Sequence, residues 1–166
     1  MAEPNTIIYK ILTLVAVLNR QLLGISIGLE TISICRSDLT GDLYCDFASD
    51  FPDPPMPGAV TVAICEGIQF VDPDFKADLV GVSLYGEIKT RERILKSCTH
   101  LPGWHDVPLA EWLETRTSRR VEIISAAKCL EYAQNSQVKN NDIKNCLLSS
   151  VGAALLAYER FKDFLD

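Results

Sequence analysis

The sequence predicts an α/β fold in which a three-stranded antiparallel meander is continued by parallel strands with helices on both faces. Ranges 22–28, 31–36 and 43–47 are strand-like and are separated by short breaks, with a turn cluster at 38–42. Range 77–84 is a continuous apolar run, which is typical of a parallel strand covered on both faces. Because strand and helix patterns alternate after the meander, the class is α/β.

The remaining elements follow from local composition. The segment 51–57 contains four prolines, which predicts a stiff, extended linker. Apolar residues recur at three- and four-residue steps over 58–71, which predicts a helix, and Pro108 opens another. We expect further elements in chain order: a charged loop at 87–93, a short strand from 94, a turn at 101–104, a strand at 121–124, helices at 126–134 and 147–165, and a polar connector at 135–145.

The chain of 166 residues is long enough for one domain with a terminal extension. We expect an extension helix over 1–20 and a single domain over 21–166. The apolar run 7–18 is too short to cross a membrane, and no basic segment of a secretory signal precedes it. Its apolar residues surround the whole helix, so another surface must cover them. The candidate association residues are Ile7, Ile8, Ile11, Leu12, Val15 and Leu18.

Two arrangements could cover this helix: it lies on its own domain, or it exchanges with a second copy in a symmetric homodimer. We prefer the homodimer. The net charge of −6 argues against nucleic acid as a partner, because phosphate-binding proteins depend on dense Lys and Arg. We also expect no binding to a membrane.

The six cysteines are widely spaced and contain no CxxC pair, and the two histidines stand without a metal-binding partner. We therefore expect no metal and no cofactor. Most of the cysteines have apolar neighbours, which favours reduced, structural thiols in a cytoplasmic protein. His105 with Asp106, and Cys98 with His100, could form acid–base or nucleophilic pairs, but loop or packing roles are the preferred interpretation. Trp104 and Trp112 are expected in the core or at its edge.

Several segments resemble the ROK family of sugar kinases. The most specific is LPGWHDVPL at 101–109, which is followed by a helix and a strand. The weaker matches are GISIGLETIS at 24–33, LTG at 39–41, GVSLYG at 81–86 and GAALLA at 152–157. The resemblance implies the small lobe of an actin-like, ribonuclease-H-like kinase, with a C-terminal helix over 146–166 that packs back on it. The family's large lobe, with its nucleotide and zinc sites, has no counterpart in this sequence.

The resemblance also implies that the catalytic positions are replaced. The family's base is the Asp of an Asn-Asp-Ala-Asn stretch, and Ala126 stands at that position here. An alanine methyl group cannot accept a proton. The family's phosphate loop corresponds to Ser26, Gly28, Leu29, Glu30 and Thr31, where Leu29 replaces a glycine and Glu30 adds negative charge.

Tyr85 and Lys89 also depart from the family pattern, in which a proline and an aspartate are usual. The leading hypothesis is therefore a non-catalytic ROK-like protein that acts through self-association or protein binding. The alternative is a sugar-binding or residual kinase-like module that uses the former hexose cleft, with Ser83, Gly103, Trp104, His105 and Ser125 as ligand-binding residues. A third hypothesis is an evolutionary or designed reduction of a kinase, without a native ligand.

Overall fold

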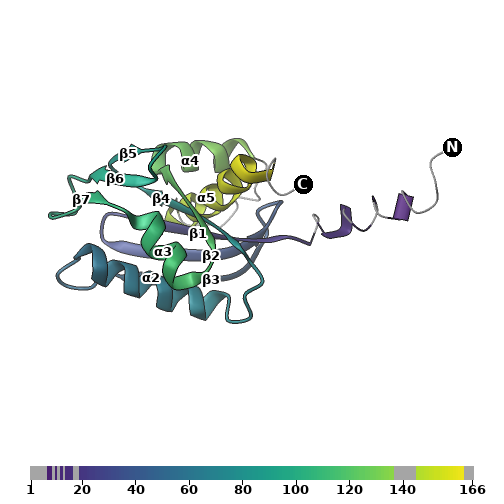
Figure 1. The fold of residues 1–166 in the computed structure, drawn as a ribbon, viewed down its shortest axis with the longest axis horizontal. Coiled ribbons are helices and arrows are strands. Elements are labelled where there is room, and N and C mark those ends of the chain that lie inside the picture. Colours follow the sequence, from purple (N-terminus) through teal and green to yellow (C-terminus); the bar gives the residue numbers. More distant parts are fainter. Residues whose placement is uncertain are drawn as a thin grey trace.

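The structure is a computed structural model that describes residues 7, 8, 10, 12, 14–16, 19–136 and 145–162. Its centre is a five-stranded sheet in the order β3-β2-β1-β4-β8 (Figure 1). The strands are β1 (Gln21–Ile27), β2 (Thr31–Asp38), β3 (Leu43–Asp50), β4 (Leu79–Leu84) and β8 (Arg120–Ser125). β1, β2 and β3 pair antiparallel, whereas β4 and β8 continue the sheet in parallel with β1. The predicted meander and its parallel continuation are confirmed.

Burial along the strands agrees with this topology. Every residue of β4 is buried, as its unbroken apolar sequence predicted for a strand with both faces covered. β3 instead alternates between half-buried and exposed residues, because it is an edge strand.

A second, three-stranded antiparallel sheet was only partly predicted. It consists of β5 (Glu87–Lys89), β6 (Ile94–Ser97) and β7 (His105–Val107). The sequence indicated a charged loop at 87–93, but part of that loop is a strand. Ion pairs support the small sheet: Lys96 lies 2.7 Å from Glu87, and Lys89 lies 2.9 Å from Asp106. Strands of three residues are too short for a period-two pattern, so their pairing could not be predicted.

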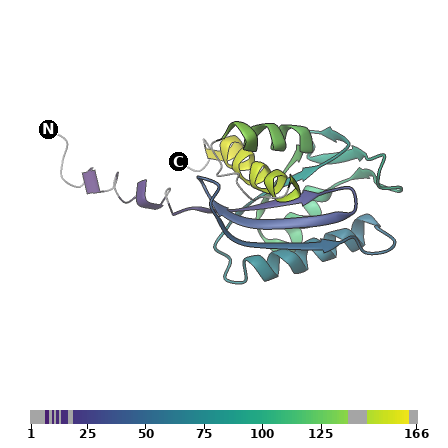
Figure 2. The same ribbon diagram turned by 180° about the vertical axis from the view of Figure 1, so that it is seen from behind.

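Two helices cover each face of the main sheet (Figures 1 and 2). α2 (Pro57–Val71) and α3 (Leu109–Thr117) lie on one face, where they enclose the larger core. α4 (Ala126–Asn135) and α5 (Asn145–Phe161) lie on the other face over a second core. All four helices were predicted, and the predicted ends of α2 and α4 and the predicted start of α5 agree with the structure within two residues. The predicted end of the last helix at 165 lies outside the described residues. The predicted connector at 135–145 lies mostly outside the described residues.

The C-terminal helix does pack back on the sheet. α5 lies against β1 and β4 at very short distance, because the strand residues beneath it are Gly24 and Gly81. On its other side, Gly152 of α5 allows the same close approach to Cys129 of α4. Glycine is needed at such positions because any Cβ would meet backbone atoms.

The N-terminal extension contributes little to this body. Its described residues between 7 and 16 are helical, and all of their side chains are exposed. Ile7, Ile8, Leu12 and Val15 are 50%, 54%, 59% and 47% exposed, so these residues do not lie on their own domain. That arrangement is therefore wrong for the described part of the helix. Ile11 and Leu18 lie outside the described residues.

Candidate functional site

The carboxyl ends of the three parallel strands meet at one edge of the sheet. β1 ends at Ile27, β4 at Leu84 and β8 at Ser125, and the strand register places these ends side by side. In open α/β sheets, ligands bind at this edge. It is also the edge at which the predicted phosphate loop and the predicted base position lie.

The turn between β1 and β2 carries the residues of the altered phosphate loop. The backbone N–H of Gly28 donates to the carbonyl of Thr31 at 2.9 Å, which closes the turn. Leu29 is 55% exposed and borders a cavity of about 240 Å³. The cavity is lined by Ser26, Gly28, Leu29, Thr31, Tyr85, Leu130 and Ser149. The exposed Glu30 is not part of this lining, so the loop presents an apolar side chain where the family's glycine would admit a phosphate.

The junction between β8 and α4 carries the expected base position. Ser125 ends the strand, and Ala126, the first residue of α4, is 2% exposed. A cavity of about 150 Å³ adjoins this junction, and its polar lining comes from Thr90, Ser125, Lys128 and Arg160. The nearby Glu122 is buried and paired with Arg160 at 2.9 Å. None of the residues that line this cavity has a carboxylate.

Ser83 was predicted to bind ligand, but the structure gives it a packing role. Its side chain is fully buried beneath α5, and its hydroxyl shares a 2.5 Å hydrogen bond with that of Ser149. It also interacts with the thiol of Cys129, whose pKa is raised to about 11, mainly by burial. Ser83 is therefore not available to a ligand at this edge.

Trp104 is likewise a core residue, as the preferred interpretation held, and not a ligand-binding one. Its side chain is fully buried, and its indole Nε1–H donates to the carbonyl of Pro55 at 2.8 Å. The neighbouring Gly103 is exposed, with a φ of +85° that glycine tolerates, and His105 is exposed on β7. The cavity beside Ser125 includes none of these three residues.

The two alternative pairs do not form reactive sites. Asp106 binds Lys89 at 2.9 Å, and this contact lowers the pKa of Asp106 and raises that of Lys89. Cys98 is buried, whereas His100 is exposed and its ring lies 5.8 Å from the ring of Tyr85. These residues have loop and packing roles.

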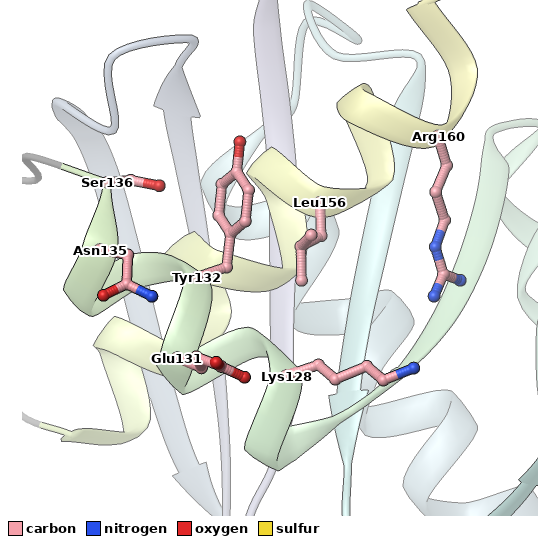
Figure 3. Close-up of a pocket in the computed structure, with 7 residues that line it drawn as sticks. All are labelled: Lys128, Glu131, Tyr132, Asn135, Ser136, Leu156 and Arg160. Atoms are coloured by element: carbon pink, nitrogen blue, oxygen red, sulfur yellow. The ribbon is translucent and has the colours of Figure 1, made fainter.

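A groove between α4 and α5 was not predicted from the sequence. It encloses about 550 Å³ and is lined by Lys128, Glu131, Tyr132, Asn135, Ser136, Leu156 and Arg160 (Figure 3). Tyr132 and Leu156 form its apolar wall, and Lys128 and Arg160 lie at one end of it. The groove depends on two helices that are adjacent only after folding, so no local pattern could reveal it.

The described residues contain no group of three or more His, Cys, Asp or Glu side chains placed to hold a metal ion. None of their helices is both long enough and apolar enough to cross a membrane. Among the cysteines whose side chains the structure describes, Cys35, Cys45, Cys65, Cys98 and Cys129 are free thiols.

Comparisons with known proteins agree with this architecture. The family model described as "ROK family" matches residues 22–155. A ROK family glucokinase from Streptomyces griseus, solved with glucose and AMPPNP, superposes with a TM-score of 0.65 at 19% identity, over 70% of this chain and 36% of its own. None of the curated proteins matches this chain.

Two more solved structures are similar. The inorganic polyphosphate/ATP-glucomannokinase from Arthrobacter sp. has a TM-score of 0.63 at 26% identity, over 72% of this chain and 50% of its own. A ROK family transcriptional regulator, a homolog of the E. coli MLC protein, has a TM-score of 0.61 at 16% identity, over 75% of this chain and 33% of its own. The chain thus spans half or less of the length of these proteins. The expected actin-like fold is confirmed, and this chain forms only a part of that fold.

Proposed function

Because this chain belongs to the ROK family, we propose that it is a non-catalytic member that acts through association, with a second copy of itself or with another protein, in the cytoplasm. The observation that carries this proposal is the set of exposed apolar side chains between residues 7 and 16. Exposed apolar surface of this kind usually marks an interaction site. A homodimer is the preferred form, since two identical segments can cover each other.

The candidate site supports the non-catalytic part of the proposal. Phosphoryl transfer to a sugar needs a group that takes the proton of the attacking hydroxyl, together with neutralisation of phosphate charge. Ala126 at the β8–α4 junction offers no proton acceptor, and the apolar Leu29 lines the cavity beside the loop. The exposed Glu30 adds negative charge to this loop, which makes phosphate binding less favourable still.

A matched pair of leucines tests the association. We would measure the molar mass of the full chain by light scattering, and compare it with that of the Leu12→Asp and Leu29→Asp variants. The two leucines are 59% and 55% exposed, so both changes place one charge on an exposed apolar position. The proposal expects a dimer for the unchanged chain and Leu29→Asp, and a monomer for Leu12→Asp. Two results together would contradict the proposal: all three proteins are monomeric, and no protein partner binds in a way that depends on Leu12.

The sugar-binding alternative rests on one observation, the cavity of about 150 Å³ beside Ser125. Its size is below the roughly 300–1,000 Å³ of typical small-molecule sites, so a bound hexose would need further surface. Calorimetric titration with glucose and mannose separates the two functions. Saturable binding that weakens in Ser125→Val, or phosphorylation of the sugar by ATP that depends on one named residue, would favour the alternative.

A further inference from the structure

Three exposed aromatic side chains lie at the end of the sheet opposite the candidate site. Tyr44, Phe70 and Phe75 are 55%, 63% and 47% exposed, and we call them the basal aromatic patch. Tyr44 is near the start of β3, Phe70 is in the last turn of α2, and Phe75 is in the loop that leads to β4. The strand register places the starts of β1, β3 and β4 at this same end.

An ion cluster around the buried Asp72 contacts two rings of this patch. The carboxylate of Asp72, which immediately follows α2, lies 3.0 Å from Arg119 and 3.6 Å from Arg36. The guanidinium of Arg119 lies 4.1 Å from the centre of the Phe75 ring, and that of Arg36 lies 5.8 Å from the centre of the Tyr44 ring. Such cation–π contacts orient an aromatic ring without burying its outer surface.

Phe70 and Tyr44 are positioned by β3 as well. The ring of Phe70 lies 5.6 Å from that of Phe47, a half-buried residue of β3. The pairing of β2 with β3 is irregular here: Arg36 pairs with Cys45, but the next residue, Ser37, pairs with Leu43, which leaves Tyr44 as an extra residue. Bulges of this kind redirect a side chain from its regular face. The rings of the patch are thus positioned by contacts within one copy, which lowers the entropy cost of binding.

The N-terminal segment leaves the fold at this same end. Arg20 is bound to the carboxylate of Asp78, just before β4, through contacts of 3.0 and 3.1 Å. Beyond it, the described residues lead away from the body of the fold in both views (Figures 1 and 2). Each copy therefore presents, at one end, an exposed apolar helix and an exposed aromatic patch that its own helix does not cover.

We propose that the N-terminal helix of one copy docks on the basal aromatic patch of a second copy, and that the exchange is reciprocal. The inference rests on the proposed self-association and names its surface. Lys10 is the single charged residue between 7 and 19, and it is complementary to the exposed Glu66, which lies one turn before Phe70 on α2.

The repetition of contacts in a reciprocal exchange also favours a second copy, because a stable interface needs about 1,200–2,000 Å² of buried area in total. In a two-fold dimer each copy contributes both its helix and its patch, so every contact occurs twice. The helix supplies Ile7, Ile8, Leu12, Leu14 and Val15, each about half exposed, and the patch supplies three aromatic rings.

Photo-crosslinking of the full chain tests this arrangement directly. Leu12 is replaced by p-benzoylphenylalanine, and the protein is prepared as a mixture of isotopically light and heavy copies. After irradiation, mass spectrometry identifies the linked peptides and distinguishes links between copies from links within one. We expect links between copies, to the peptides that contain Tyr44, Phe70 or Phe75. Links within one copy, or to the groove between α4 and α5, would overturn the inference while leaving self-association intact.

Two serine variants give an independent measurement by light scattering over a range of concentrations. Phe70→Ser removes the most exposed ring of the patch, and Val62→Ser is the matched control, an exposed apolar residue elsewhere on α2. We expect Phe70→Ser to weaken dimerisation at least about tenfold, or 1.4 kcal/mol, and Val62→Ser to leave it unchanged. Equal effects would overturn the inference. A monomeric unchanged chain would overturn the proposed self-association itself, and a urea melt of each variant verifies that it is folded.

Discussion

Gly81 lies so close to α5 that a Cβ atom on it would stand 1.9 Å from the carbonyl oxygen of Ala153. Its register partner on β1, Gly24, has the same relation to the carbonyl oxygen of Ser150. The two glycines are therefore adjacent on neighbouring strands and form the floor on which the C-terminal helix rests. Both occur in segments that resemble ROK motifs, so a feature of the resemblance has a packing function that is independent of catalysis.

Replacing Gly81 should destabilise the fold strongly. In Gly81→Ala, the new methyl group meets backbone atoms of α5, which cannot move without displacing the helix. We expect a loss of at least about 1–3 kcal/mol in the free energy of unfolding, measured by urea denaturation. Gly58→Ala is the control, because a Cβ there meets nothing within 4 Å and its backbone is helical. This control should be neutral or stabilising by up to about 1 kcal/mol, and equal losses in both variants would contradict the packing.

Removing the charge of Asp72 should also be costly. Its carboxylate accepts hydrogen bonds from the backbone N–H groups of Lys76 and Ala77 and from Arg119, which is itself buried. Asp72→Asn leaves the Arg119 charge without its partner, and breaking a buried pair in this way costs about 3–5 kcal/mol. The control is Asp74→Asn, an exposed residue 3.9 Å from Lys76, which should change the free energy of unfolding by less than about 0.5 kcal/mol.

The same carboxylate makes the effect depend on pH. Burial would raise the pKa of Asp72, but the hydrogen bonds from Lys76, Ala77 and Arg119 outweigh it and hold the pKa below its ordinary value of 3.8. Its contribution is therefore fully present above that ordinary value and is lost as the pH falls through the lower pKa of the folded state. Urea melts of the unchanged chain and Asp72→Asn should differ by a constant amount at neutral pH and converge below about pH 4. A difference that persists unchanged in acid would contradict this assignment.

Cysteine reactivity should follow burial. Burial raises the pKa of the Cys35 thiol to about 12 and that of Cys129 to about 11, whereas Cys45 is only half-buried on the edge strand β3. Because the thiolate is the reactive form, iodoacetamide at about pH 8 should alkylate Cys45 well before the other two. Mass spectrometry of timed samples measures the order, and addition of urea should make the three rates similar. Comparable rates in the native protein would show that α5 does not shield Cys35 and Cys129.

The sequence could locate only those parts of the candidate site that lie where one predicted element is directly followed by the next. The β1–β2 turn and the β8–α4 junction were located correctly, because each follows directly from a strand pattern and a sequence motif. Ser83 and Trp104 belonged to the ligand-binding alternative, although Trp104 was also expected in the core or at its edge, and neither residue type by itself reveals that it is fully buried. Ser83 is covered by Ser149, which is distant in sequence, and Trp104 is held by the carbonyl of Pro55.

The order of strands and helices, the parallel continuation of the meander and the family could all be inferred before folding was considered, because periodicity, prolines and the LPGWHDVPL segment are local signals. How these elements pack on one another became visible only in three dimensions. The small sheet pairs strands of only three or four residues, the groove at Tyr132 and Leu156 forms between two packed helices, and the basal aromatic patch around Asp72 joins segments from distant parts of the chain. The physical reason is that a side chain's burial and charge environment are set by its neighbours in space, which a sequence pattern does not contain.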